Sequence, residues 1–132
     1  MKVFVDTSAI LALASRTDEA HTQAVVAYGN LRASSAELIT TSYIFLESVS
    51  LIQRRLGAQA AVAAGKLLSQ AYTIIWVDAS LHHSGWEAFH GDGRRLLSLV
   101  DCVSFAAMRR ERLRFAFAFD RHFEEAGFEM AR

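Results

Sequence analysis

The 132-residue sequence contains no proline and only one cysteine. A lone cysteine, Cys102, cannot form a disulfide within the chain, and we interpret it as a small buried hydrophobic residue in a reducing cytoplasm. No apolar run approaches the roughly 18 residues of a membrane-spanning helix. The apolar N-terminal run resembles a signal peptide, but the charge of Asp6 in its middle argues against insertion. These absences predict a soluble cytoplasmic protein with no membrane partner.

An excess of charge of one sign is also absent, because 14 basic and 14 acidic residues give a formal net charge of zero. Composition alone therefore indicates no polyanionic partner. The sequence lacks a Gly-x-x-x-x-Gly-Lys phosphate loop, a Gly-x-Gly-x-x-Gly fingerprint and a Gly-x-Ser-x-Gly elbow. Its five histidines show no His-Glu-x-x-His spacing. These absences argue against a nucleotide-dependent enzyme and a serine hydrolase, and they give no zinc signature.

What the sequence does contain is an alternation of short strand-like runs with longer helical patterns. With 52% hydrophobic residues, residues 1–132 can bury the core of a single domain. The runs that resemble strands are apolar and rich in β-branched or aromatic residues: Lys2–Val5, Glu37–Thr40, Thr73–Val77 and Arg114–Phe119. The expected helices are Ser8–Ser15, Asp18–Ala33, Ser42–Leu56, Ala58–Gln70, Ala79–Phe89, Leu99–Arg112 and Arg121–Ala126, with a Gly-rich loop over His90–Leu97. This alternation predicts parallel strands joined by right-handed crossovers, with helices on both faces of the sheet.

Four carboxylates stand at the ends of apolar segments or inside them: Asp6, Glu47, Asp101 and Asp120. An ionised carboxylate beside apolar surface is costly without a cation or hydrogen-bond donors, and only Asp120 has a basic neighbour, Arg121. Asp6 and Asp120 directly follow the first and fourth predicted strands, at the sheet edge where open parallel sheets bind ligands. Glu47 and Asp101 lie early in helices that can begin at the same edge. The pattern indicates a shared metal, and oxygen ligands suit Mg²⁺ or Mn²⁺ better than Zn²⁺.

Helix capping is the structural alternative for each aspartate taken alone. Asp6 and Asp78 precede predicted helices and are in position to accept backbone N–H groups. Ser98 and Asp101 match a capping box, and Asp120 precedes the last predicted helix. For any single aspartate, capping is the simpler explanation, and we assign Asp78 to it.

Glu47 is harder to explain by capping, because on a helix it shares an apolar stripe with Ile44 and Leu51. Asp101 also lies on an apolar stripe of its helix. Two helices that each carry an acid on an apolar stripe are unusual for capping alone, so we interpret these acids as functional. Asp92, in the Gly-rich loop, is interpreted as a solvated turn residue.

The motifs around these acids resemble a known family. They are Val5-Asp6-Thr7-Ser8-Ala9, Glu47 early in a helix, Ser98-Leu99-Val100-Asp101-Cys102-Val103-Ser104-Phe105-Ala106, and Phe119-Asp120-Arg121-His122-Phe123. Taken in order, they span essentially the whole chain and resemble the PIN-domain ribonucleases, most of all the VapC-type toxins of prokaryotic toxin–antitoxin pairs. The resemblance implies a three-layer α/β/α sandwich around a central parallel sheet, with a divalent-metal site built from the four acids. It also implies cleavage of RNA, a cognate antitoxin that covers the site, and commonly a toxin homodimer.

The chemistry of such a site suggests a role for each acid. Four clustered carboxylates cannot all ionise without a cation, and a bound Mg²⁺ or Mn²⁺ lowers the pKa of a water molecule. Under this hypothesis Asp6 and Asp101 are the principal ligands. Glu47 would hold the metal and help to deprotonate the water, and Asp120 would support a second metal or the water. Attack by water predicts 5′-phosphate and 3′-hydroxyl ends.

Two other functions are compatible with a domain of this kind. One is a catalytically inactive PIN-like module that binds RNA or docks a protein, against which the intact acids argue. The other is a phosphotransfer receiver domain, which requires paired acids after the first strand and a lysine late in the sheet; this chain has only Asp6 there, and Lys2 and Lys66 are badly placed. If the substrate is RNA, Arg94 and Arg95 in the predicted loop are candidates to meet its backbone.

Overall fold

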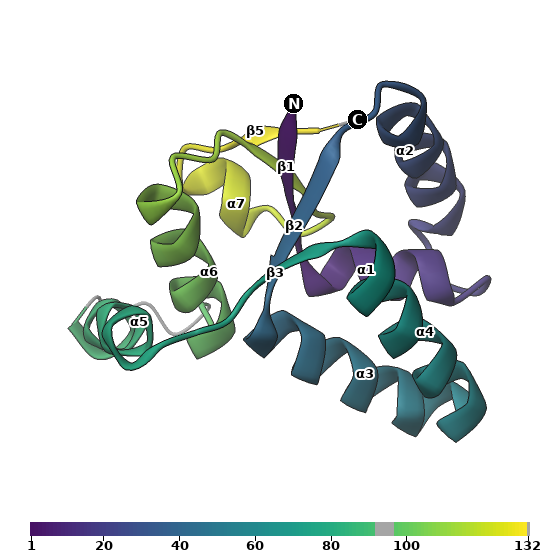
Figure 1. The fold of residues 1–132 in the computed structure, drawn as a ribbon, viewed down its shortest axis with the longest axis horizontal. Helices are drawn as coiled ribbons and strands as arrows, with labels where there is room; N and C mark the ends of the chain where they lie inside the picture. Colours follow the sequence, from purple (N-terminus) through teal and green to yellow (C-terminus); the bar gives the residue numbers. More distant parts are fainter. Residues whose placement is uncertain (92–96, 132) are drawn as a thin grey trace.

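The computed structural model describes residues 1–91 and 97–131, and within them five strands form one sheet (Figure 1). The strands are β1 (Lys2–Val5), β2 (Glu37–Thr41), β3 (Thr73–Ile75), β4 (Phe115–Phe117) and β5 (Glu129–Met130). Their order is β3-β2-β1-β4-β5, and every pairing is parallel. The predicted parallel sheet is therefore confirmed. Strand β5 was not expected, because two residues are too few to show a period of two.

Seven helices surround the sheet in the described part of the chain. They are α1 (Thr7–Ala14), α2 (His21–Ala33), α3 (Ser42–Leu56), α4 (Ala58–Ala71), α5 (Ala79–Gly91), α6 (Leu99–Arg110) and α7 (His122–Glu125). The helix predicted from Asp18 begins three residues later, because the Asp18 side chain accepts the Ala20 N–H at 2.8 Å and closes a turn instead. Helix α6 ends before its predicted last residue, Arg112, whose φ of 55° is left-handed.

The helices form two layers, with α1 to α4 on one side of the strands and α5 to α7 on the other (Figure 1). In the central strand β1, Val3, Phe4 and Val5 are all fully buried. Because successive side chains of a strand point to opposite faces of the sheet, this pattern requires a covered sheet on both sides. On one side, the ring of Phe4 lies 6.1 Å from that of Phe123 in α7. The predicted three-layer α/β/α sandwich is confirmed.

The carboxyl ends of the parallel strands lie at one edge of the sheet, and helices begin there directly. Asp6 joins β1 to α1, and Thr41 ends β2 and caps α3. Asp78 follows β3 and accepts the Leu81 N–H at 2.7 Å, as expected of a helix cap. Asp120 lies between β4 and α7. This edge therefore gathers acids that are far apart in the sequence. Within the described ranges, no helix is both long and apolar enough to cross a membrane.

The contact between α5 and α6 depends on Gly85. A Cβ atom at this position would lie 2.9 Å from Cα and 3.0 Å from the backbone nitrogen of Val103, and closer still to its Cγ2 atom. Val103 is fully buried, so its backbone cannot easily withdraw. We expect Gly85→Ala to destabilise the protein by about 1–3 kcal/mol through overpacking, as measured by denaturant unfolding.

Gly29→Ala on α2 is the matched control, because a Cβ atom there meets nothing within 4 Å. A helical alanine is favoured over glycine, so this variant should be about 0.5–1 kcal/mol more stable than the wild type. If the two substitutions change the free energy of unfolding equally, the close approach of α5 and α6 at Gly85 does not require a glycine there.

Candidate metal centre

Asp6 is held at the junction of β1 and α1 and is only 2% exposed. Its backbone N–H donates to the Phe117 carbonyl of β4 at 3.0 Å, which fixes its place at the sheet edge. Its Oδ2 atom accepts the Ser8 N–H at 3.1 Å and the Ser8 hydroxyl at 2.6 Å, and that hydroxyl in turn accepts the Phe119 N–H at 2.9 Å. Asp6 is therefore a helix cap, as the structural alternative predicts. The cap uses one oxygen only; within residues 1–91 and 97–131, Oδ1 accepts no hydrogen bond.

Burial raises the pKa of Asp6 from 3.8 to about 6. The two hydrogen bonds from Ser8 oppose the rise, and the negative charges of Asp120 and Asp101 add to it. The charges of Asp120 and Asp101 therefore act on the carboxyl group of Asp6 as well. A cation between them would remove both the mutual repulsion and much of the burial penalty.

Asp101 is the third residue of α6 and is 7% exposed. It forms the predicted capping box, in which its N–H donates to the Ser98 hydroxyl at 3.0 Å and its Oδ2 accepts the Ser98 N–H at 3.2 Å. The same Oδ2 lies 3.1 Å from Nδ1 of His122. An ionised carboxylate can only accept, so with Asp101 in its charged form we assign the proton of this hydrogen bond to Nδ1. In the described structure, Oδ1 of Asp101 is left without a donor.

Asp120 is half-buried beside Asp101. Its Oδ1 accepts the His122 N–H at 2.8 Å, as in a helix cap, and lies 3.4 Å from the His122 Nδ1 atom. Burial raises the pKa of Asp120, the His122 N–H opposes this, and the charge of Asp101 adds to the rise. The imidazole of His122 therefore lies between two carboxylates and holds them together.

Two of the predicted ligands lie together at a distance that fits a divalent cation. One possible ligand atom each from Asp101, Asp120 and His122 lie within 4.8 Å of one another, and among the described residues Asp6 lies outside this tight group. The hydroxyl of Thr7, the residue after Asp6, is buried without a hydrogen-bond partner among the described residues. A bound cation would account for these features of the site. It would pair with the free carboxylate oxygens and the unpartnered hydroxyl, and it would stabilise the charged forms of the two acids whose pKa values are raised. Oxygen donors predominate, which suits Mg²⁺ or Mn²⁺.

Glu47 is placed less clearly than the three aspartates. It is half-buried in the second turn of α3, which begins at the same sheet edge. On its stripe, Ile44 is fully buried and Leu51 half-buried, as the apolar pattern predicts. Within the described residues, however, Glu47 is not among the charges that act on Asp6 or Asp120. Its part in the site therefore stays a prediction.

The predicted loop over His90–Leu97 is only partly described. Helix α5 continues through Gly91, so His90 is helical and the loop prediction was wrong at its start. Asp92, Arg94 and Arg95 lie outside the described residues.

His122 is the site residue that sequence reasoning missed. The five histidines were judged by the spacing of zinc motifs, and His122 has no such partner. The signal was its place two residues after Asp120, because an aspartate side chain commonly accepts the backbone N–H of the residue two positions later. The closeness to Asp101, 21 residues earlier, depends on tertiary packing and has no local signal.

The chain is similar to known proteins over nearly its whole length. The family model described as the PIN domain matches residues 3–129. The chain is 38% identical over 128 residues to the 23S rRNA-specific endonuclease VapC20 of Mycobacterium tuberculosis, and the match covers 96% of this chain and 95% of the relative.

The fold also matches solved structures. The crystal structure of Mycobacterium tuberculosis VapC20, described as a sarcin–ricin loop cleaving toxin, matches with a TM-score of 0.84 and 37% identity over 96% of this chain and 95% of that chain. The structure of VapBC2 from Rickettsia felis, bound to a DNA fragment from its promoter, matches with a TM-score of 0.71 over 98% and 97% of the two chains. At 12% identity, this second match shows the fold alone.

Proposed function

This chain belongs to the PIN-domain family, and we infer from that premise and from its acidic site that it is a metal-dependent endoribonuclease. It hydrolyses phosphodiester bonds in RNA and serves as the toxin of a toxin–antitoxin pair. The relative that is 38% identical over nearly the full length of both chains acts on 23S rRNA, so 23S rRNA is the first substrate to test.

One observation supports the proposal: Asp101 and Asp120 each bring a carboxylate oxygen into one group of atoms within 4.8 Å, and the charges of both acids act on the buried Asp6. Asp6 and Asp101 each keep an oxygen that, within the described chain, accepts no hydrogen bond. Capping therefore leaves one carboxylate oxygen of each acid unused. Each acid can cap its helix with one oxygen and bind a metal ion with the other. The inactive-module alternative has no comparable support, because the acids are present and converge.

Each residue of the site has a proposed role in the reaction. Asp6 and Asp101 would hold Mg²⁺ or Mn²⁺, with Asp120 completing the set. The ion, when bound, lowers the pKa of a water molecule and neutralises charge on the scissile phosphate. Ser8 orients Asp6 by donating to Oδ2. Glu47 would take the proton of the attacking water, and Asp120 would orient that water.

His122 acts through the acids and not on the substrate. Its Nδ1–H lies 3.1 Å from Asp101 and 3.4 Å from Asp120, so it keeps the two carboxylates at a fixed separation. Hydrogen bonds of this kind orient metal ligands and restrict their rotation. We assign His122 as a positioning residue.

Exposed apolar side chains support a protein partner. Trp76 is 71% exposed, and Leu46 and Trp86 are also exposed. A contiguous apolar patch on a surface marks a contact with a partner protein, and we propose that these side chains contribute to one that meets the cognate antitoxin or the second subunit of a homodimer. A cytoplasmic location, expected from the single cysteine, stays a prediction.

The test is incubation of the purified protein with total RNA, with and without Mn²⁺, followed by mapping of the new ends. We expect discrete cuts in the presence of the metal, with 5′-phosphate and 3′-hydroxyl ends, because water and not the ribose 2′-oxygen attacks. Ends that carry a 2′,3′-cyclic phosphate would refute the mechanism. Intact RNA at every metal concentration would refute the function.

A further inference from the structure

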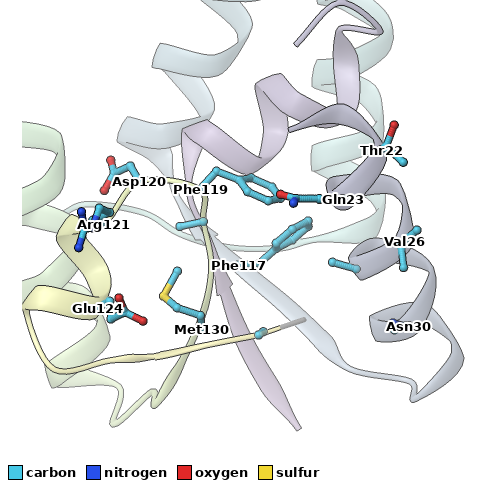
Figure 2. A pocket seen from close by; sticks show the side chains of 13 residues that line it. Thr22, Gln23, Val26, Asn30, Phe117, Phe119, Asp120, Arg121, Glu124 and Met130 are labelled. Carbon is cyan, nitrogen blue, oxygen red and sulfur yellow. The ribbon is translucent and has the colours of Figure 1, made fainter. Parts of the chain in front are cut away.

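A hollow of about 600 Å³ opens beside the acidic site, between α2 and the segment that follows β4 (Figure 2). One wall comes from α2, and the other from Phe117 through Arg121, with Met130 of β5 contributing as well. Asp120 belongs to this lining as well as to the candidate metal centre. The hollow is therefore continuous with the place where the scissile phosphate would bind.

The α2 wall presents unpaired amide groups. Gln23 and Asn30 are seven residues apart, so they lie on one face of the helix, and both side chains are exposed. In the part of the chain that the structure describes, neither side chain forms a hydrogen bond, although both line the hollow. A side-chain amide offers a donor and an acceptor together, which is what the edge of a nucleobase requires.

The opposite wall is aromatic. Phe119 is half-buried, and Figure 2 shows its ring directed from the β4 segment toward α2, near Gln23. Phe117 lies beneath it, with the two ring centroids 5.8 Å apart at 68°. Proteins that recognise RNA single strands stack unpaired bases on such rings. A partly exposed ring facing free amides can contact both the face and the edge of one base.

The charge at the rim suits a phosphate. Arg121 is exposed, lines the hollow and forms no ion pair within residues 1–91 and 97–131. A free guanidinium next to Asp120 can bind the phosphate adjoining the cleaved one. Glu124, also in the lining, repels a second phosphate and can accept an N–H group from a base. The lining of this hollow is mainly apolar, and it also presents an aromatic ring, free amides and a cation, which is the combination that an unstacked nucleotide requires.

We propose that this hollow is a subsite for one unstacked nucleotide of the RNA, adjacent to the scissile phosphate. In it, Phe119 supports the face of the base, Gln23 beside that ring binds its edge, Asn30 lines the same wall two helical turns farther along α2, and Arg121 binds a neighbouring phosphate. The assignment rests on the proposed function for its substrate class. It makes α2 the element that selects the nucleotide next to the cut.

The experiment compares the wild type with the Gln23→Ala/Asn30→Ala double variant and with Gln70→Ala. Gln70 is exposed on α4 and is not part of the hollow, so it is the matched control. Binding of a fluorescently labelled single-stranded RNA of mixed sequence is measured by anisotropy with Ca²⁺ in place of Mg²⁺. The double variant should bind roughly tenfold more weakly, as expected when contacts to a base edge are lost, and Gln70→Ala should match the wild type. Thermal unfolding checks that both variants fold.

A second measurement is the distribution of bases beside the cuts that each protein makes in total RNA with Mn²⁺. The preference at one flanking position should weaken in the double variant alone. If the double variant binds and cuts RNA as the wild type does, the subsite is refuted and the nuclease stands. If the double variant loses RNA binding while the wild type binds RNA without cutting it, the subsite is supported and the proposed nuclease activity is refuted. Unchanged RNA binding with weakened binding of the purified antitoxin would make the hollow a protein-docking groove and overturn the proposal.

Discussion

Asp6→Asn should reduce RNA cleavage roughly 10³-fold or more, because it removes a proposed ligand of the metal. The charge stabilisation that a bound metal supplies is worth several kcal/mol, and about 1.4 kcal/mol corresponds to a factor of ten in rate. Asparagine keeps an oxygen that accepts from Ser8, so the start of α1 should be preserved. Initial rates on total RNA with saturating Mn²⁺ measure the effect.

The same substitution should stabilise the metal-free protein at neutral pH. In the folded state Asp6 must ionise while buried, and burial raises its pKa from 3.8 to about 6. Above that pH, the folded protein holds a charge at a penalty of about 3 kcal/mol, since one pKa unit corresponds to about 1.4 kcal/mol. Asparagine carries no charge and avoids this penalty. Loss of activity together with a gain in stability is the signature of a functional acid and not of a structural one.

Asp18→Asn is the matched control for Asp6→Asn. Asp18 also accepts a backbone N–H in a turn, at 2.8 Å from Ala20, but it lies outside the candidate metal centre. This variant should cut RNA at the wild-type rate. An Asp6→Asn protein that is folded and fully active would remove the basis for the metal site.

Removal of the metal with EDTA should abolish cleavage and make the stability of the wild type fall as the pH rises. Between about pH 4 and pH 7, the folded state binds more protons than the unfolded state, because the folded pKa of Asp6 lies above its ordinary value. The free energy of unfolding therefore decreases with pH in this window, by about 3 kcal/mol from Asp6. The raised pKa of Asp120 acts in the same direction. Below pH 4 both acids are protonated in either state, and the contribution vanishes.

Saturating Mn²⁺ or Mg²⁺ should restore cleavage and remove the decrease in stability, since carboxylates bind the ion in their charged form. Thermal unfolding from pH 4 to pH 8, with EDTA or with metal, measures this. Other acids also titrate in this range, so the informative quantity is the difference between the wild type and Asp6→Asn in EDTA. A difference that does not grow between about pH 4 and pH 7 would contradict the raised pKa.

The convergence of the aspartates followed from local features of the sequence. Asp6 and Asp120 each end an apolar run, and the carboxyl ends of parallel strands share one edge, so topology alone placed them together. Asp101 was predicted to lie at this edge because it comes early in a helix that packs on the same sheet. The capping box around Asp101 was predicted from four consecutive residues and is present.

The features of the site that could not be predicted from the sequence depend on how the helices are rotated and packed. The direction of the Glu47 side chain depends on the rotation of α3 about its axis, and an apolar stripe on each side of that helix leaves the rotation open. The contact of His122 with Asp101 and the hollow beside α2 arise from the docking of segments far apart in the chain. The close approach at Gly85 likewise depends on how α5 and α6 pack. No local periodicity encodes such distances.

The Ser8 hydroxyl joins Asp6 to the Phe119 N–H across 111 residues of sequence. Strand β4, which carries that N–H group to its place beside β1, is formed near the end of the chain. Residues 1–110 contain α1 to α6 but supply neither Asp120 nor His122. A growing polypeptide that has not yet reached β4 therefore lacks both this hydrogen bond and one of the acids of the proposed metal site.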